Sequence, residues 1–107
     1  MQNKADLHVH TNLSDGTFTP QEVIEYAVKL RLSAIAITDH DSVEGVGPAL
    51  AAAKAKGIEV IPGIEFTTEF QGCEAHILGF FINYKKKWLS DELRLLRSLR
   101  RFLPRQA

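Results

Sequence analysis

The sequence predicts an α/β fold in which parallel strands lie inside and helices lie outside. Strand-like apolar runs at 5–10, 33–38 and 58–63 alternate with two helical patterns, one that starts at Thr19 and one at 44–56. This alternation predicts βαβ units and therefore a parallel sheet. The handedness of such units places the helices against the outside of the sheet.

The first predicted helix has a strong N-terminal signal. Thr19 is the N-cap, Pro20 is the first helical residue, and Glu22 lies three residues after the cap. The run 33–38 (SAIAIT) is short and almost entirely apolar, which is typical of a strand buried on both faces. The second helix is rich in alanine and is followed by Gly57, a residue favoured directly after helices.

Two more strands and a C-terminal helix complete the predicted elements. The segments 64–70 and 74–82 have the composition of strands and are joined near Gly72. From about Ser90, leucines recur at helical spacing up to Pro104, which predicts an amphipathic helix that ends at this proline.

Composition limits the classes of protein to consider. The 107 residues make one domain at most, and 45% of them are hydrophobic, as in ordinary globular proteins. The single cysteine, Cys73, excludes an internal disulfide and favours a reducing compartment, so we expect a cytoplasmic location. The sequence has no apolar run long enough to cross a bilayer, so we expect no membrane partner.

Charge is distributed unevenly along the chain. Residues 85–107 contain eight basic and two acidic residues, a net charge of +6, whereas residues 1–84 contain five basic and eleven acidic residues, a net charge of −6. The acidic part suits cation binding, and the basic tail suits either a phosphate-rich partner or a solvated helix face, which we favour. Beyond Trp88 the tail has one aromatic residue, Phe102, and no recognition motif, so we do not expect a nucleic-acid partner.

The segment 6–17 (DLHVHTNLSDGT) contains the first chemical signal. His8 and His10 are two residues apart in a predicted strand, so both imidazoles lie on the same face. Paired imidazoles are poor core material, because their ring nitrogens need partners when buried, but they are good metal ligands.

All four histidines lie within a predicted strand or beyond its carboxyl end, with acidic residues near them. Loops after parallel strands gather at one edge of the sheet, so we expect one cluster. Taken singly, His76 could be a hydrogen-bonded core residue, TDHD a helix-capping loop and Glu65 a strand-end charge. Nitrogen and oxygen ligands without thiolate suit manganese, zinc or iron. The candidate metal ligands are His8, His10, Asp15, His40, Glu65 and His76.

Four segments in order resemble the PHP (polymerase and histidinol phosphatase) family of metal-dependent phosphoesterases. They are DLHVHTNLSDGTFTPQEVIEYA, AIAITDHDSVEG, VIPGIEFTTEF and AHILGFFI, and the resemblance extends over residues 5–84. It implies the N-terminal part of a distorted seven-stranded (β/α) barrel and hydrolysis of a phosphate monoester on a small phosphorylated metabolite or nucleotide, with a metal-activated water as nucleophile.

The resemblance also implies roles for individual residues. His8 and His10 would hold one metal that Glu65 bridges to a neighbour, while Asp15 and His40 would serve a second metal. Glu65 with His76 would serve a third, giving up to three divalent ions. Asp39 and Asp41 would orient His40, unless they act only as caps.

The resemblance predicts two parts, residues 1–84 as the N-terminal part of the PHP domain and residues 85–107 as a basic amphipathic helix with a truncated tail. The family also takes ligands from a C-terminal half, and this sequence has no histidine after His76. We therefore expect an incomplete enzyme whose barrel is closed by a missing C-terminal half or by a homo-oligomer. The alternatives are a non-catalytic metal-binding remnant and the related hydrolase superfamily that cleaves amides, although SDGT and TDHD favour phosphate chemistry.

Overall fold

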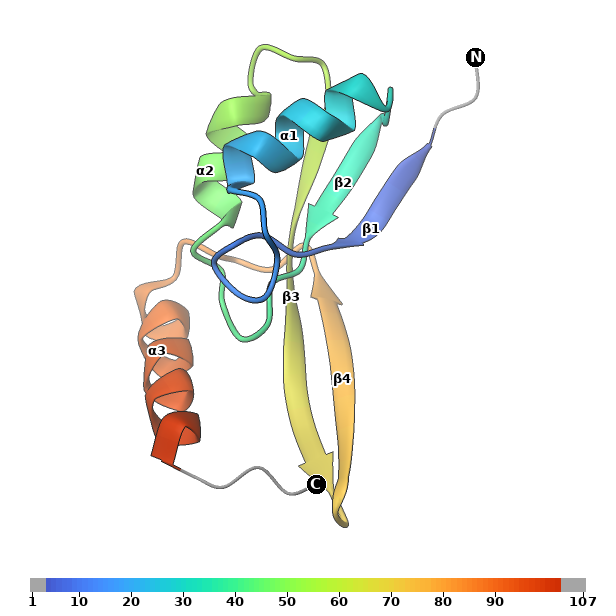
Figure 1. Cartoon of the computed structure of the whole chain (residues 1–107). Coiled ribbons are helices and arrows are strands. Elements are labelled where there is room, and N and C mark those ends of the chain that lie inside the picture. Colours follow the sequence, from blue (N-terminus) through green and yellow to red (C-terminus); the bar gives the residue numbers. More distant parts are fainter. Residues whose placement is uncertain (1–3, 103–107) are drawn as a thin grey trace.

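The computed structural model describes residues 4–102, which form a four-stranded sheet with two helices packed against one part of it and a third beside its loops (Figure 1). The strands follow the order β1-β2-β3-β4 across the sheet. The elements are β1 (Ala5–Val9), α1 (Pro20–Lys29), β2 (Ala34–Ile37), α2 (Val46–Ala53), β3 (Glu59–Phe70), β4 (Cys73–Phe80) and α3 (Lys87–Phe102).

The sheet is mostly parallel, as predicted, but its last strand is not. β1 pairs in parallel with β2, and β2 with the first part of β3. β4 runs antiparallel to β3, from Gly63 opposite Phe80 to Phe70 opposite Cys73. The prediction of parallel strands therefore does not hold for β4, because the two residues between β3 and β4 are far too few for the crossover that parallel strands require.

The capping box at the start of α1 is confirmed. The Thr19 hydroxyl accepts a hydrogen bond from the Glu22 backbone amide, and the Glu22 carboxylate accepts one from the Thr19 amide. The helix then buries Val23, Ile24 and Ala27 against the sheet and α2. This cap stabilises a helix end by about 1 kcal/mol and fixes where the chain leaves the loop after β1.

The core lies between β2, the first half of β3, and the helices α1 and α2. In β2, Ile35, Ala36 and Ile37 are almost completely buried, which confirms the prediction of a strand covered on both faces. α2 begins at Val46 and not at Glu44, after a Gly45 N-cap that supplies no side-chain hydrogen bond. It ends at Ala53, earlier than predicted, and Gly57 lies beyond it with a positive φ of 69°.

β3 is one long strand of 12 residues, where the sequence predicted two. Its first residues pair with β2 up to Pro62 opposite Ile37, and its later residues, from Gly63 on, pair with β4. Pro62 has no amide to donate, and Gly63 lies where a side chain would meet Thr38 Cγ2 at 2.8 Å. The Pro-Gly pair therefore marks the change of partner within a continuous strand.

The C-terminal helix, α3, begins at Lys87, earlier than the predicted Ser90, and its predicted end at Pro104 lies outside the described residues. Leu93 is buried and Leu89 packs against the core, whereas the Trp88 side chain remains exposed. Figure 1 shows α3 beside the loop that connects β2 to α2.

The two outer strands expose apolar side chains, as expected for part of a barrel. Leu7 in β1 and Ile77 in β4 are about half exposed, and Phe81 just after β4 is 74% exposed. Among residues 4–102, no helix has both the length and the apolar character that a membrane crossing requires.

Candidate metal centre

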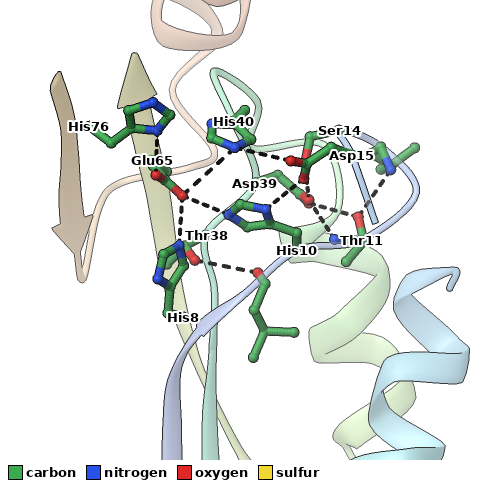
Figure 2. Close-up of polar contacts among 12 residues, drawn as sticks. His8, His10, Thr11, Ser14, Asp15, Thr38, Asp39, His40, Glu65 and His76 are labelled. Atoms are coloured by element: carbon green, nitrogen blue, oxygen red, sulfur yellow. Dashed lines mark hydrogen bonds and ion pairs between the residues drawn. The ribbon is translucent and has the colours of Figure 1, made fainter. Parts of the chain in front are cut away.

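The six predicted ligands come together at one place on the sheet (Figure 2). His8 lies in β1, and His10 and Asp15 lie in the loop after it. His40 lies in the loop after β2, Glu65 lies in β3 and His76 lies in β4. The structure therefore brings all six into one cluster, although they are spread over 69 positions of the sequence.

Glu65 is at the centre of this cluster. It is only 4% exposed, and its Oε1 lies 2.7 Å from Nε2 of both His8 and His10. Its Oε2 lies 2.7 Å from Nδ1 of His76, and its Oε1 lies 4.0 Å from Nε2 of His40. All four histidines thus face a single buried carboxylate.

Asp15 forms a second acidic position at the edge of the cluster. Its Oδ1 lies 2.6 Å from Nδ1 of His10, and its Oδ2 lies 3.2 Å from Nε2 of His40. Because His10 contacts Glu65 through its other nitrogen, its imidazole connects the two carboxylates. The Asp15 side chain is 61% exposed, so this side of the cluster is open to solvent.

The imidazoles form a continuous row of edge-on contacts. Ring centroids are 5.0 Å apart for His8 and His10, 4.5 Å for His10 and His40, and 5.2 Å for His40 and His76. Each ring is thereby held by its neighbours as well as by a carboxylate.

The two acids remain ionised in this setting. Burial alone would raise the pKa of Glu65, but hydrogen bonds from His8, His10 and His76 and the charge of His40 outweigh it and lower this pKa to about 2. Burial would also raise the pKa of Asp15. The hydrogen bond from His10 and the charges of His10 and His40 outweigh burial, so this pKa is lowered. Both carboxylates are therefore negative at neutral pH and are suited to bind cations.

The donor set fits divalent metal ions. The residues form three groups. Within each group every residue offers one ligand atom, and these atoms lie within 4.8 Å of one another. Imidazole nitrogens and carboxylate oxygens are the ligands of manganese, zinc and iron sites. The groups are His8, His10 and Glu65; His10, Asp15 and His40; and His40, Glu65 and His76.

The backbone fixes His40 against β3. The Asp41 amide donates to the Glu65 carbonyl, and the Glu65 amide donates to the Asp39 carbonyl, each at 3.0 Å. Asp41 has a positive φ of 47°, and its carboxylate accepts from the Thr67 amide at 3.3 Å. The Thr67 hydroxyl lies 3.5 Å from Nδ1 of His40, so Asp41 is linked to this imidazole through Thr67.

The contacts of the Asp39 carboxylate are with the loop after β1, and its predicted role in orienting His40 stays a prediction. Its fully buried carboxylate accepts from the Thr11 amide at 2.6 Å, from the Thr11 hydroxyl at 2.7 Å and from the Ser14 hydroxyl at 2.7 Å. None of the contacts described for its side chain involves the His40 ring. Asp39 instead holds the loop that carries His10 and Asp15.

Sequence reasoning did not identify Thr11 and Ser14 as part of the site. Both hydroxyls lie within HTNLSDG, between the predicted ligands, and this proximity was the available signal. Both hydroxyls donate to Asp39, and Gly45 packs closely against this carboxylate. A side chain added at Gly45 would meet Asp39 Oδ2 at 2.9 Å and Thr11 Oγ1 at 3.1 Å. The glycine before α2 is therefore required by this buried network.

Comparison with known proteins agrees with this geometry. Residues 6–97 match the PHP domain family. The chain is 40% identical over 80 residues to the 5'-3' exoribonuclease Rnm of Escherichia coli, which covers 73% of this chain and 27% of that protein. It is 37% identical over 92 residues to the 3',5'-nucleoside bisphosphate phosphatase of Chromobacterium violaceum, which covers 86% of this chain and 32% of that protein. The chain thus spans less than a third of the length of these relatives.

Solved structures show the same likeness. An amidohydrolase from Chromobacterium violaceum, solved with bound sulfate and no metal, superposes with a TM-score of 0.84 at 36% identity, over 91% of this chain and 34% of that one. A Bifidobacterium adolescentis protein described as a metal-dependent phosphoesterase gives a TM-score of 0.82 at 34% identity, over 95% of this chain and 36% of that one. Since the family match extends over most of the sequence and the site has the family's expected donors, this chain belongs to the PHP domain family.

Proposed function

We propose that this chain provides the metal centre of a phosphoesterase that hydrolyses a phosphate monoester on a small phosphorylated metabolite or nucleotide. The observation that carries the proposal is the convergence of four imidazoles on the buried Glu65 carboxylate, with Asp15 at the open edge. A structural role needs no histidines, because amide and hydroxyl donors alone satisfy the buried Asp39 carboxylate.

The proposed centre holds up to three divalent ions of manganese, zinc or iron. His8 and His10 serve one ion with Glu65, Asp15 and His40 serve a second, and Glu65 with His76 serves a third. When bound, such ions neutralise phosphoryl oxygens and activate water for attack on phosphorus.

The chain's own residues divide into an anchor and an open rim. Glu65 is buried and fixes the imidazoles, whereas the side chains of His8, Asp15 and His76 are 51%, 61% and 40% exposed. A phosphate group therefore approaches from the rim, while the buried side holds the ligands in position. Asp41 orients His40 through Thr67 in this proposal.

The relatives' names support a nucleotide-like substrate, as either a monoester or a diester. A bisphosphate phosphatase cleaves a terminal phosphate, and an exoribonuclease cleaves a phosphodiester, and both names occur among the relatives. The second candidate function is therefore phosphodiester cleavage at an RNA end. The further length of the relatives supports completion of a seven-stranded barrel by additional polypeptide, and a second copy of this chain is the alternative proposal.

The test is hydrolysis by the manganese-loaded chain, with its mass in solution measured in parallel. Phosphate release from a nucleoside 3',5'-bisphosphate is expected in the wild type and is expected to be lost in Glu65→Gln. Glu59→Gln, an exposed acid on the same strand, is the matched control and should retain activity. Preferential cleavage of 5'-labelled RNA would favour the second candidate, and unchanged turnover in Glu65→Gln would contradict both.

A further inference from the structure

The C-terminal helix contacts the loop that carries His40. Arg97 on α3 donates from Nη1 to the backbone carbonyl of Asp41 at 2.6 Å and from Nη2 to Oε1 of Glu44 at 3.1 Å. Its side chain is 29% exposed, so the contact is partly shielded from water. One guanidinium thus ties both ends of the segment 41–44 to a helix more than 50 positions later in the chain.

The carbonyl that Arg97 binds belongs to a residue with an uncommon backbone conformation. Asp41 has a φ of 47°, in the left-handed region that residues with a side chain rarely adopt. Such a conformation persists only when surrounding contacts impose it. Three contacts do so here: the Asp41 amide to the Glu65 carbonyl, the Asp41 carboxylate from the Thr67 amide, and the Asp41 carbonyl from Arg97.

His40 precedes this residue directly, so the contacts of Asp41 hold the backbone that carries the imidazole. The ring lies 3.2 Å from Asp15 and 4.0 Å from Glu65, and it takes part in two of the three candidate ligand groups. A small rotation at Asp41 would displace His40 from both. The His8–His10–Glu65 group does not include His40, so we expect it to change far less.

We propose that Arg97 is a positioning residue of the metal centre, which holds His40 in its ligating orientation by binding the Asp41 carbonyl and the Glu44 carboxylate. A planar, forked donor suits two acceptors at once, which a lysine does not match. The inference rests on the proposed metal centre and assigns part of its geometry to α3.

Arg94 gives a matched control. It lies one turn earlier on the same helix, its Nη2 is 3.9 Å from the same Glu44 oxygen, and its side chain is 66% exposed. Replacing Arg94 removes the same charge near Glu44, but it leaves the hydrogen bond to the Asp41 carbonyl in place. The pair therefore separates the effect of the hydrogen bond from that of charge alone.

The experiment is titration of the full 107-residue chain with Co²⁺. Binding is monitored by the visible absorption of the ion and by calorimetry. His40→Ala and His8→Ala first identify which binding step depends on each histidine. Arg97→Ala should weaken the His40-dependent step by about tenfold or more and change its absorption, as expected when a group that orients a ligand is removed. The His8-dependent step should stay unchanged, and Arg94→Ala should match the wild type.

Arg97→Lys keeps the experiment decisive if circular dichroism shows that Arg97→Ala is unfolded. It retains the charge but lacks the planar fork that fits both acceptors, so it should weaken the same step. A folded Arg97 variant with wild-type affinity and absorption at both steps would overturn the role of Arg97 alone. A folded wild-type chain that binds no Co²⁺ would overturn the metal centre and, with it, the role of Arg97.

Discussion

Two buried carboxylates, Asp39 and Glu65, lie close together in this protein and differ in the partners that surround them. Asp39 accepts hydrogen bonds from one amide and two hydroxyls, which belong to Thr11 and Ser14. Glu65 is surrounded by imidazoles. Amide and hydroxyl donors satisfy an anion permanently, whereas an imidazole that gives up its proton becomes a metal ligand. The partners of Asp39 therefore suit a structural role, whereas the partners of Glu65 suit the proposed metal binding.

The largest expected effect would break the structural side of this comparison. Asp39→Ala leaves the buried amide and hydroxyl of Thr11 without their acceptor, and each costs about 1–3 kcal/mol, so the free energy of unfolding should fall by about 2–6 kcal/mol. Urea unfolding of the metal-free chain measures it, with Glu25→Ala on the exposed side of α1 as the control. A loss as small as that of the control would mean that Asp39 does not hold the loop.

The second prediction concerns the chemical side. Glu65→Gln removes the charge shared by two of the three candidate ligand groups, so manganese affinity should fall more than about 100-fold, beyond the usual effect of residues that only support ligands. Calorimetric titration measures the affinity, with Glu59→Gln as the control.

Removal of metal by a chelator should distinguish the wild type from Glu65→Gln. The wild type should lose about 2.7 kcal/mol of stability relative to protein with manganese at 100 times its Kd. The same comparison should show almost no manganese-dependent change for Glu65→Gln. Equal stabilisation of the wild type and Glu65→Gln by manganese would contradict the assignment of Glu65 as a ligand.

A smaller effect should sharpen the account of the Asp39 region. Thr11→Val removes the hydroxyl that donates to Asp39 and accepts from the Leu13 amide, so the free energy of unfolding should fall by about 1–2 kcal/mol. Thermal unfolding with and without manganese measures it. Because the Thr11 amide still binds Asp39, metal affinity should change far less than in Glu65→Gln.

The smallest effect is expected for Ser14→Ala. Asp39 Oδ1 keeps the Thr11 amide as a donor, so the loss should be about 1 kcal/mol or less. Double-mutant analysis with Thr11→Val would show whether the two hydroxyls act independently. A loss for Ser14→Ala larger than that for Thr11→Val would reverse the order that burial and contact number predict.

The elements with local signals were the ones that the sequence predicted well. The capping box at Thr19 and the buried run that became β2 need no distant partner to be recognised. The meeting of the histidines also followed from a general rule, because parallel strands end at one edge of a sheet. The structure has the predicted residues in one cluster, and their roles as ligands stay predictions.

The features that were missed depend on contacts between distant segments. Pro62 and Gly63 suggested a strand end, but pairing with two different neighbours keeps β3 continuous through them. The partners of Asp39 come from a loop 25 to 28 positions earlier, and the Asp41 carbonyl meets Arg97 56 positions later. No local pattern encodes such pairings.

The antiparallel pairing of β3 and β4 has a consequence for how the length of this protein can vary. His76 lies opposite Thr67 and on the same face as Glu65, because side chains alternate along each strand. A one-residue slip of β4 would turn the imidazole to the other face, and a two-residue slip would move it by about 7 Å. The site therefore tolerates insertions and deletions at the turn formed by Gln71 and Gly72. It does not tolerate them within the two strands between that turn and the cluster.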